Sequence, residues 1–136
     1  LLGSSHTKRY LDLIELHIIR CLRTKKNYST SKLKDFCYYL TSYIVEVRAC
    51  SLYHCYDSIL KKENIPFRLT PIINEEVSHL DYMKLIVSKY NLDEIIDQCR
   101  AEEIKLFSII MNEISKNIST YKANKDKDVD PLSMVS

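Results

Sequence analysis

The stretch RACSLYHCYDSIL, residues 48–60, gathers two cysteines, a histidine and two tyrosines within one short segment. Cys50 and His54 are four positions apart, so on a helix they would share one face. His17 and Cys21 repeat this spacing earlier in the chain. If the two pairs faced each other, they would supply the two thiolates and two imidazoles that zinc accepts in a tetrahedral site.

The alternative interpretation of these residues is packing. A free cysteine behaves as a small apolar residue and often fills a core position. The sequence also lacks the short Cys-x₂-Cys spacing that makes a zinc prediction strong. Weighing the two, we expect packing, with no bound metal and no cofactor.

Nucleophilic catalysis is the other chemistry that this stretch could support. His54 could activate the Cys50 thiol, but the pair would then sit in the middle of a helix. Gly3 is the only glycine of the chain, so a glycine-rich loop for phosphate or oxyanion binding cannot be built. We therefore expect no catalytic residues and a non-enzymatic protein.

The composition defines the elements that must position these side chains. The chain has 136 residues, of which 46% are hydrophobic, so one domain with one core is expected. One glycine and three prolines leave little material for tight hairpin turns and favour long helices. The five cysteines, an odd number, are typical of reduced thiols in the nucleus or cytoplasm. Apolar runs are too short to predict a membrane span.

Apolar residues at three- and four-residue spacing predict helices over about 7–23, 30–60, 71–90 and 93–121. The second helix carries two apolar stripes that are out of phase, which predicts either a kink near 48–51 or burial of different faces along its length. Residues 71–90 could form one helix or two, because Ser78 could start a new one. In the last helix, Glu103 interrupts an otherwise apolar seam. Thr70 and Pro71 are expected to start the third helix.

The fold prediction is an all-α bundle of four to five helices with long second and last helices. Its single helical domain spans residues 7–121. Residues 1–6 are expected to be an unstructured start or an artificial junction, and residues 122–136 a disordered tail.

Tyrosine is the main functional signal, with ten in the chain and five on the predicted second helix. They cannot all enter one core, and tyrosine is enriched at protein interfaces. We expect an intracellular interaction module, such as a scaffold or adaptor domain, that binds a partner helix or subunit beside the second helix. The expected partner-binding residues are Tyr39, Tyr43, Leu52, Tyr53, Tyr56, Arg23, Lys25 and Lys26.

Four alternatives stay open. Residues 1–70 hold 12 Lys or Arg against 6 Asp or Glu, and the basic segment 20–34 could bind nucleic acid phosphates. A homodimer would close the tyrosine-rich face on a second copy. A secreted four-helix signalling protein would share the long helices, although the odd cysteine count weighs against it. A pathogen protein that occupies a host partner would have the same signature.

Overall fold

The computed structural model describes residues 4–127, which form four α-helices and short connections. They are α1 (Ser4–Lys25), α2 (Thr30–Lys62), α3 (Thr70–Lys89) and α4 (Asp93–Lys127). The all-α prediction is confirmed, and four helices match the lower end of the predicted count. Within residues 4–127, none of these helices combines the length and apolarity that crossing a membrane requires.

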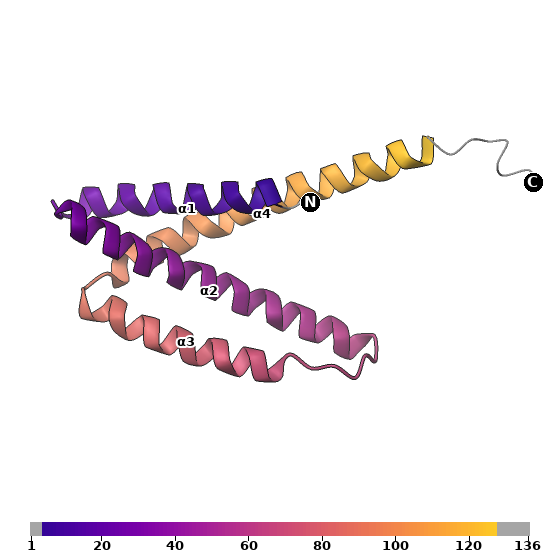
Figure 1. Cartoon of the computed structure of the whole chain (residues 1–136), viewed down its shortest axis with the longest axis horizontal. Helices are drawn as coiled ribbons and strands as arrows, with labels where there is room; N and C mark the ends of the chain where they lie inside the picture. Colours follow the sequence, from indigo (N-terminus) through magenta and orange to yellow (C-terminus); the bar gives the residue numbers. More distant parts are fainter. Residues whose placement is uncertain (1–3, 128–136) are drawn as a thin grey trace, which may run out of the picture.

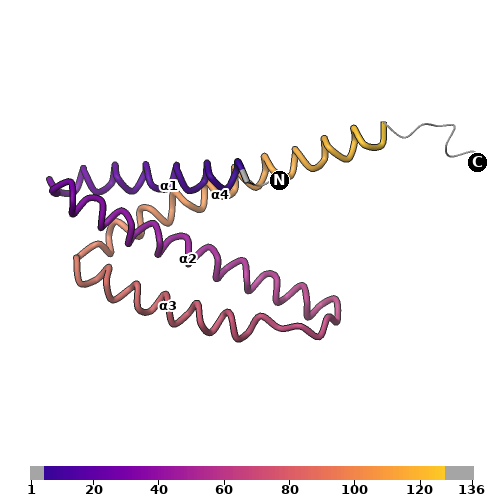
Figure 2. The backbone as a smooth tube through the Cα atoms, in the orientation of Figure 1, coloured from indigo at the N-terminus to yellow at the C-terminus, as the bar shows by residue number. Residues whose placement is uncertain are grey.

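The helices run alternately up and down and associate as two pairs (Figure 1). α1 lies along α4, and α2 lies along α3. The two pairs meet at the end where the α1–α2 and α3–α4 connections lie, and they diverge toward the other end (Figure 2). The described chain therefore has the shape of a V, and the far part of α4 extends beyond the start of α1.

The core fills the closed end of the V, where all four helices contribute apolar side chains. Its most buried members are Ile18, Leu22, Leu40, Ile44, Val87, Leu92, Ile95 and Cys99. Apolar burial of this kind is the main driving force for association of amphipathic helices. The open end of the V has no comparable cluster among the described residues, so its helices keep apolar side chains at the surface.

The helix ends explain how a chain with one glycine makes its turns. The Ser29 hydroxyl caps α2 by accepting a hydrogen bond from the Lys32 backbone N–H at 3.3 Å. Asn64 follows α2 and Asn91 follows α3, and both have φ of 56°. This is the left-handed conformation that usually ends a helix at glycine, and asparagine tolerates it better than other residues. Asparagine therefore substitutes for glycine at both turns.

The out-of-phase stripes of the second helix are explained without a kink, because α2 is one continuous helix. Phe36, Leu40 and Ile44 enter the core at the closed end. The later part of α2 lies beside α3, away from α1 and α4 (Figure 1). Its neighbours change along its length, so the face that it buries changes too.

Several predicted boundaries are wrong. α1 begins before Thr7 and ends after Arg23. Of the two alternatives left open for residues 71–90, the structure has one helix, α3, without a restart at Ser78. Leu69, rather than Thr70, caps α3, and its backbone N–H donates to the Asp57 carboxylate at 2.8 Å. The predicted tail over 122–136 is helical as far as Lys127, because α4 continues along its axis. The remaining parts of the predicted start and tail, 1–3 and 128–136, lie outside the described residues.

Candidate functional site

The cysteines and histidine of RACSLYHCYDSIL point in different directions on α2. Cys50 is buried, whereas His54 and Cys55 are exposed. The structure does not bring Cys50 and His54 to His17 and Cys21, so the four-residue zinc hypothesis is wrong in that form. Within this stretch Cys50 is buried, as the packing interpretation predicted, while Leu52, Tyr53 and Leu60 are half-buried.

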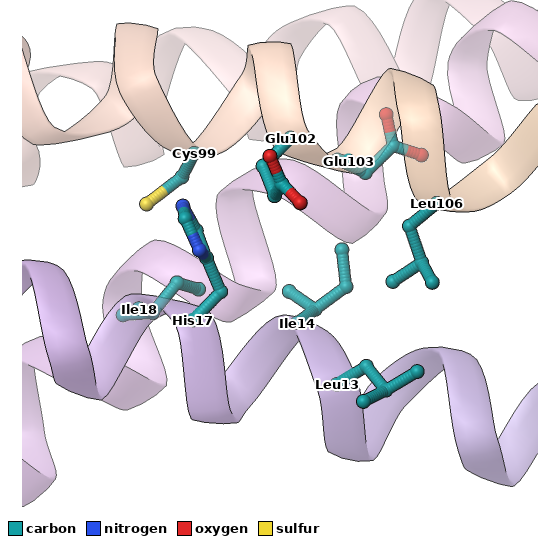
Figure 3. Close-up of a pocket in the computed structure, with 8 residues that line it drawn as sticks. All are labelled: Leu13, Ile14, His17, Ile18, Cys99, Glu102, Glu103 and Leu106. Carbon is teal, nitrogen blue, oxygen red and sulfur yellow. The ribbon is translucent and has the colours of Figure 1, made fainter.

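His17 and Cys21 are instead joined by Cys99 of α4. The three possible ligand atoms lie within 4.8 Å of one another, and His17 Nε2 is 3.4 Å from Cys21 Sγ. Figure 3 shows the His17 ring and the Cys99 side chain turned toward each other between α1 and α4. Burial, with a smaller contribution from the neighbouring Cys21, raises the pKa of the Cys99 thiol. Spacing along one helix could not identify Cys99 as the neighbour of His17 and Cys21, because it lies on α4.

A buried ionic cluster joins three helices a short distance along the same interface. Glu103 is 5% exposed, and its carboxylate accepts hydrogen bonds from Arg48 Nε at 2.7 Å and Arg48 Nη2 at 2.9 Å. The Tyr10 hydroxyl donates to the same carboxylate at 2.8 Å. The Arg48 guanidinium also lies 4.0 Å from the centre of the Phe107 ring. Glu103 therefore interrupts the apolar seam of α4 because it forms a buried ion pair with Arg48.

The protonation states in this cluster follow from its contacts. Burial, followed by the hydrogen bond to Glu103, raises the pKa of the Tyr10 hydroxyl. The hydrogen bond to Glu103 also raises the pKa of Arg48. Tyr10 therefore stays a donor and Arg48 stays charged. All three groups are engaged with one another, which suits a structural clamp between α1, α2 and α4.

A second titratable cluster connects α2 to α3 through Glu46, Glu76 and His79, whose ligand atoms also lie within 4.8 Å of one another. Glu76 Oε2 is buried and has no hydrogen-bond partner within residues 4–127 while both carboxylates are ionised. A proton on Glu46 would allow it to donate to Glu76. This hydrogen bond, and then burial, raises the pKa of Glu46 to about 7.

An apolar groove lies between α2 and α3 on the outer side of the bundle. It has a volume of about 270 Å³ and is lined by Tyr38, Tyr39, Ser42, Tyr82, Met83 and Ile86. Tyr38 is 69% exposed and Tyr82 is 65% exposed. Leu85, on the next turn of α3 from Tyr82, is 71% exposed. Large side chains this exposed are candidates for contact with another molecule.

The structure separates the predicted partner-binding residues of α2 into three environments. Tyr39 lines the groove and stacks on Tyr90, with ring centres 6.0 Å apart. Tyr43 belongs to the core, so we remove it from the proposed surface. Leu52 and Tyr53 are half-buried, and Tyr56 is exposed. The sequence analysis missed Tyr38 and Tyr82, because the partner helix of a groove cannot be read from one helix alone.

The predicted basic residues Arg23, Lys25 and Lys26 are exposed at the closed end of the V. A broad hollow of about 610 Å³ includes Lys25 and Lys26 and adds Lys32 and Lys89 from α2 and α3. Lys25 Nζ donates to the Asn91 carbonyl at 2.7 Å, so this lysine also holds the α3–α4 connection.

Comparison with known proteins gives no relative from which to transfer a function: no family model, curated protein or solved structure matches the chain.

Proposed function

We propose that this protein is a non-enzymatic helical interaction module that binds a helix of a partner protein in the groove between α2 and α3. The groove residues Tyr38 and Tyr82 are the observation that carries the proposal, because two large aromatic side chains from different helices border one apolar depression. A partner helix would place apolar anchors at three- and four-residue spacing into such a groove.

The position of α3 supports a helix as the occupant. α3 packs chiefly against α2, so much of its circumference has no helical neighbour within residues 4–127. Exposed apolar residues are spread along it: Ile72, Val77, Tyr82 and Leu85. A helix laid in the groove would bury Tyr82, which borders it, and would complete a three-helix layer. Val77 points about 140° away from Tyr82 around the α3 axis and would stay exposed.

The proposal retains the tyrosine-rich face of α2 but places its centre at Tyr38 and Tyr39 rather than at Tyr53 and Tyr56. The interface would be largely apolar, since the groove residues other than Ser42 are aromatic or aliphatic. Tyrosine suits such a site because its ring buries a large area while its hydroxyl stays hydrated.

The test is selection of amphipathic helical peptides, displayed as a library, against the folded chain. Selected peptides should carry apolar anchors at i, i+3 or i+4, and i+7. Tyr82→Asp should weaken their binding by about 30-fold, which corresponds to about 2 kcal/mol for a hot-spot residue.

Tyr56→Asp is the matched control, because Tyr56 is an exposed tyrosine of α2 outside the groove. It should leave binding unchanged. Peptides that bind equally well to the Tyr82→Asp variant would refute the site. A solution mass of twice 16.0 kDa that Tyr82→Asp reduces to the monomer would show a second copy as the occupant instead.

A second candidate function is nucleic-acid binding at the closed end of the V. The supporting observation is that four lysines from three helices or their connections surround one hollow: Lys25, Lys26, Lys32 and Lys89. The ring of Tyr28, which lies within the basic segment, packs against Phe36 with ring centres 5.1 Å apart, so it is less available to stack on a base. Phosphate contact is therefore better supported than base stacking.

This candidate predicts binding that falls steeply with salt. Anisotropy of a labelled single-stranded RNA should show it, and Lys26→Glu should weaken binding and reduce the salt slope by about one. Lys116→Glu, on the exposed part of α4, is the control that should have little effect. Equal losses in both variants would indicate a nonspecific charge effect.

A further inference from the structure

The cluster of His17, Cys21 and Cys99 has the composition and geometry of a metal site. Its donors are one imidazole nitrogen and two sulfurs. This ligand set suits zinc, whereas magnesium and calcium prefer oxygen ligands. His17 and Cys21 come from successive turns of α1, and Cys99 comes from α4. A bound ion would therefore cross-link two helices that are far apart in the sequence.

The distances are close to those of a loaded site. With Zn–S of about 2.3 Å and Zn–N of about 2.0 Å, tetrahedral ligand atoms lie about 3.5–3.8 Å apart. His17 Nε2 and Cys21 Sγ are already 3.4 Å apart, and all three atoms lie within 4.8 Å of one another. The ligand atoms would have to move by only about 1 Å to reach tetrahedral separations, which side-chain rotation can supply.

The surroundings provide both space and a route of entry. A small cavity of about 10 Å³, room for roughly one water molecule, is lined by His17, Cys99 and Glu102 (Figure 3). His17 and Cys21 are only half-buried, so the cluster is reached from solvent. Two thiolates would also neutralise a divalent ion, which limits the cost of placing the charge between helices.

We infer that His17, Cys21 and Cys99 bind one zinc ion between α1 and α4, with a water molecule at the fourth position. The Glu102 carboxylate, which lines the cavity, adds favourable negative charge beside the ion. This site is independent of the α2–α3 groove. It would fasten α1 to α4 near the closed end of the V, in addition to the apolar core.

The experiment uses the full chain of 136 residues, reduced and freed of metal with a chelator. Zn²⁺ is titrated in competition with a chromophoric chelator to obtain stoichiometry and affinity, and Co²⁺ is then added as a spectroscopic probe. We expect one Zn²⁺ per chain and, with Co²⁺, the thiolate charge-transfer and tetrahedral ligand-field absorption of a sulfur-rich site.

His17→Gln and Cys21→Ser should each weaken zinc affinity at least about 100-fold, since even loss of a group that only supports a ligand costs up to that amount. His54→Gln and Cys55→Ser remove an exposed histidine and an exposed cysteine from α2, and they should have no effect. Cys99 belongs to the core, so the conclusion depends on the variants at the half-buried positions His17 and Cys21. Circular dichroism verifies that each variant is helical.

Three results would overturn the inference. The folded wild type could bind no stoichiometric Zn²⁺, or His17→Gln and Cys21→Ser could bind it as tightly as the wild type does. Equal loss of affinity in the His54→Gln and Cys55→Ser controls would likewise place the metal elsewhere.

Discussion

Replacing Glu103 with glutamine tests whether the ionic cluster is a clamp between helices. Glu103→Gln keeps the shape of the side chain and removes its charge, so Arg48 loses its ionic partner inside the bundle. The amide oxygen can still accept two hydrogen bonds, but the amide NH2 takes the place of the second carboxylate oxygen, so one of the three donors from Arg48 and Tyr10 loses its acceptor. We expect a large loss of folding free energy.

The magnitude follows from burial. Removing one partner of a buried ion pair costs about 3–5 kcal/mol, because the other charge is left without compensation. The Arg48 side chain is 19% exposed and, with Ser51 and Arg100, lines a cavity of about 190 Å³ that can hold water, so it is partly solvated. The lower value, about 3 kcal/mol, is therefore expected, against a total stability on the order of 5–15 kcal/mol for a domain.

Urea unfolding followed by circular dichroism measures this loss, and a double-mutant cycle separates the ion pair from its desolvation cost. In a Tyr10→Phe background, which removes the hydroxyl that Glu103 accepts from, Arg48→Met combined with Glu103→Leu removes both charges and should recover to within about 1 kcal/mol of Tyr10→Phe alone. Tyr10→Phe should cost about 1.5 kcal/mol, the lower range for a hydrogen bond to a charged group. A cost below about 1 kcal/mol for Glu103→Gln would refute the clamp, as would a double variant no more stable than the single one.

Three further predictions concern pH and helix ends. The folded state raises the pKa of Glu46 from its ordinary 4.5 to about 7, so it binds an extra proton between these values and becomes more stable as pH falls through this window. Relative to Glu46→Gln, the wild type should gain about 0.5–1 kcal/mol on going from about pH 8 to about pH 5, a small value because the pair is partly in solvent; equal pH profiles would contradict it. Ser29→Ala should cost about 1 kcal/mol in urea unfolding by removing the α2 cap, and Ser29→Asp should restore most of it. Asn91→Ala should cost about 1 kcal/mol because its φ is 56°, whereas Asn91→Gly should be neutral or stabilising; equal effects would argue against a conformational cause.

The sequence was sufficient for the fold class because helix formation depends on local patterns. The scarcity of glycine and proline and the three- and four-residue apolar spacing predicted the four helical segments. Element ends were less well predicted. α4 continues to Lys127 although the apolar seam weakens after Ile118, since its lysines and Ala123 have high helix propensity and can extend a helix already started.

The sequence also drew attention to His17, Cys21 and Glu103 but not to their partners. Cys21 and His17 were recognised by their spacing on one helix, which is a local property. That Cys99 faces them, rather than Cys50 and His54, depends on the antiparallel pairing of α1 with α4. In the same way, Glu103 was seen as an interruption of a seam, while its partners Arg48 and Tyr10 lie on two other helices.

What the sequence by itself determined is therefore the helical class, the positions of the main elements and the face of each helix that is apolar. Only the tertiary structure decided which faces meet. Tyr43 entered the core and Tyr39 was left lining the groove, although they are four positions apart and share one face of α2. The physical reason is that periodicity specifies the direction of a side chain around its own axis, whereas burial depends on the neighbouring helices, and at the open end of the V the described chain provides few of them.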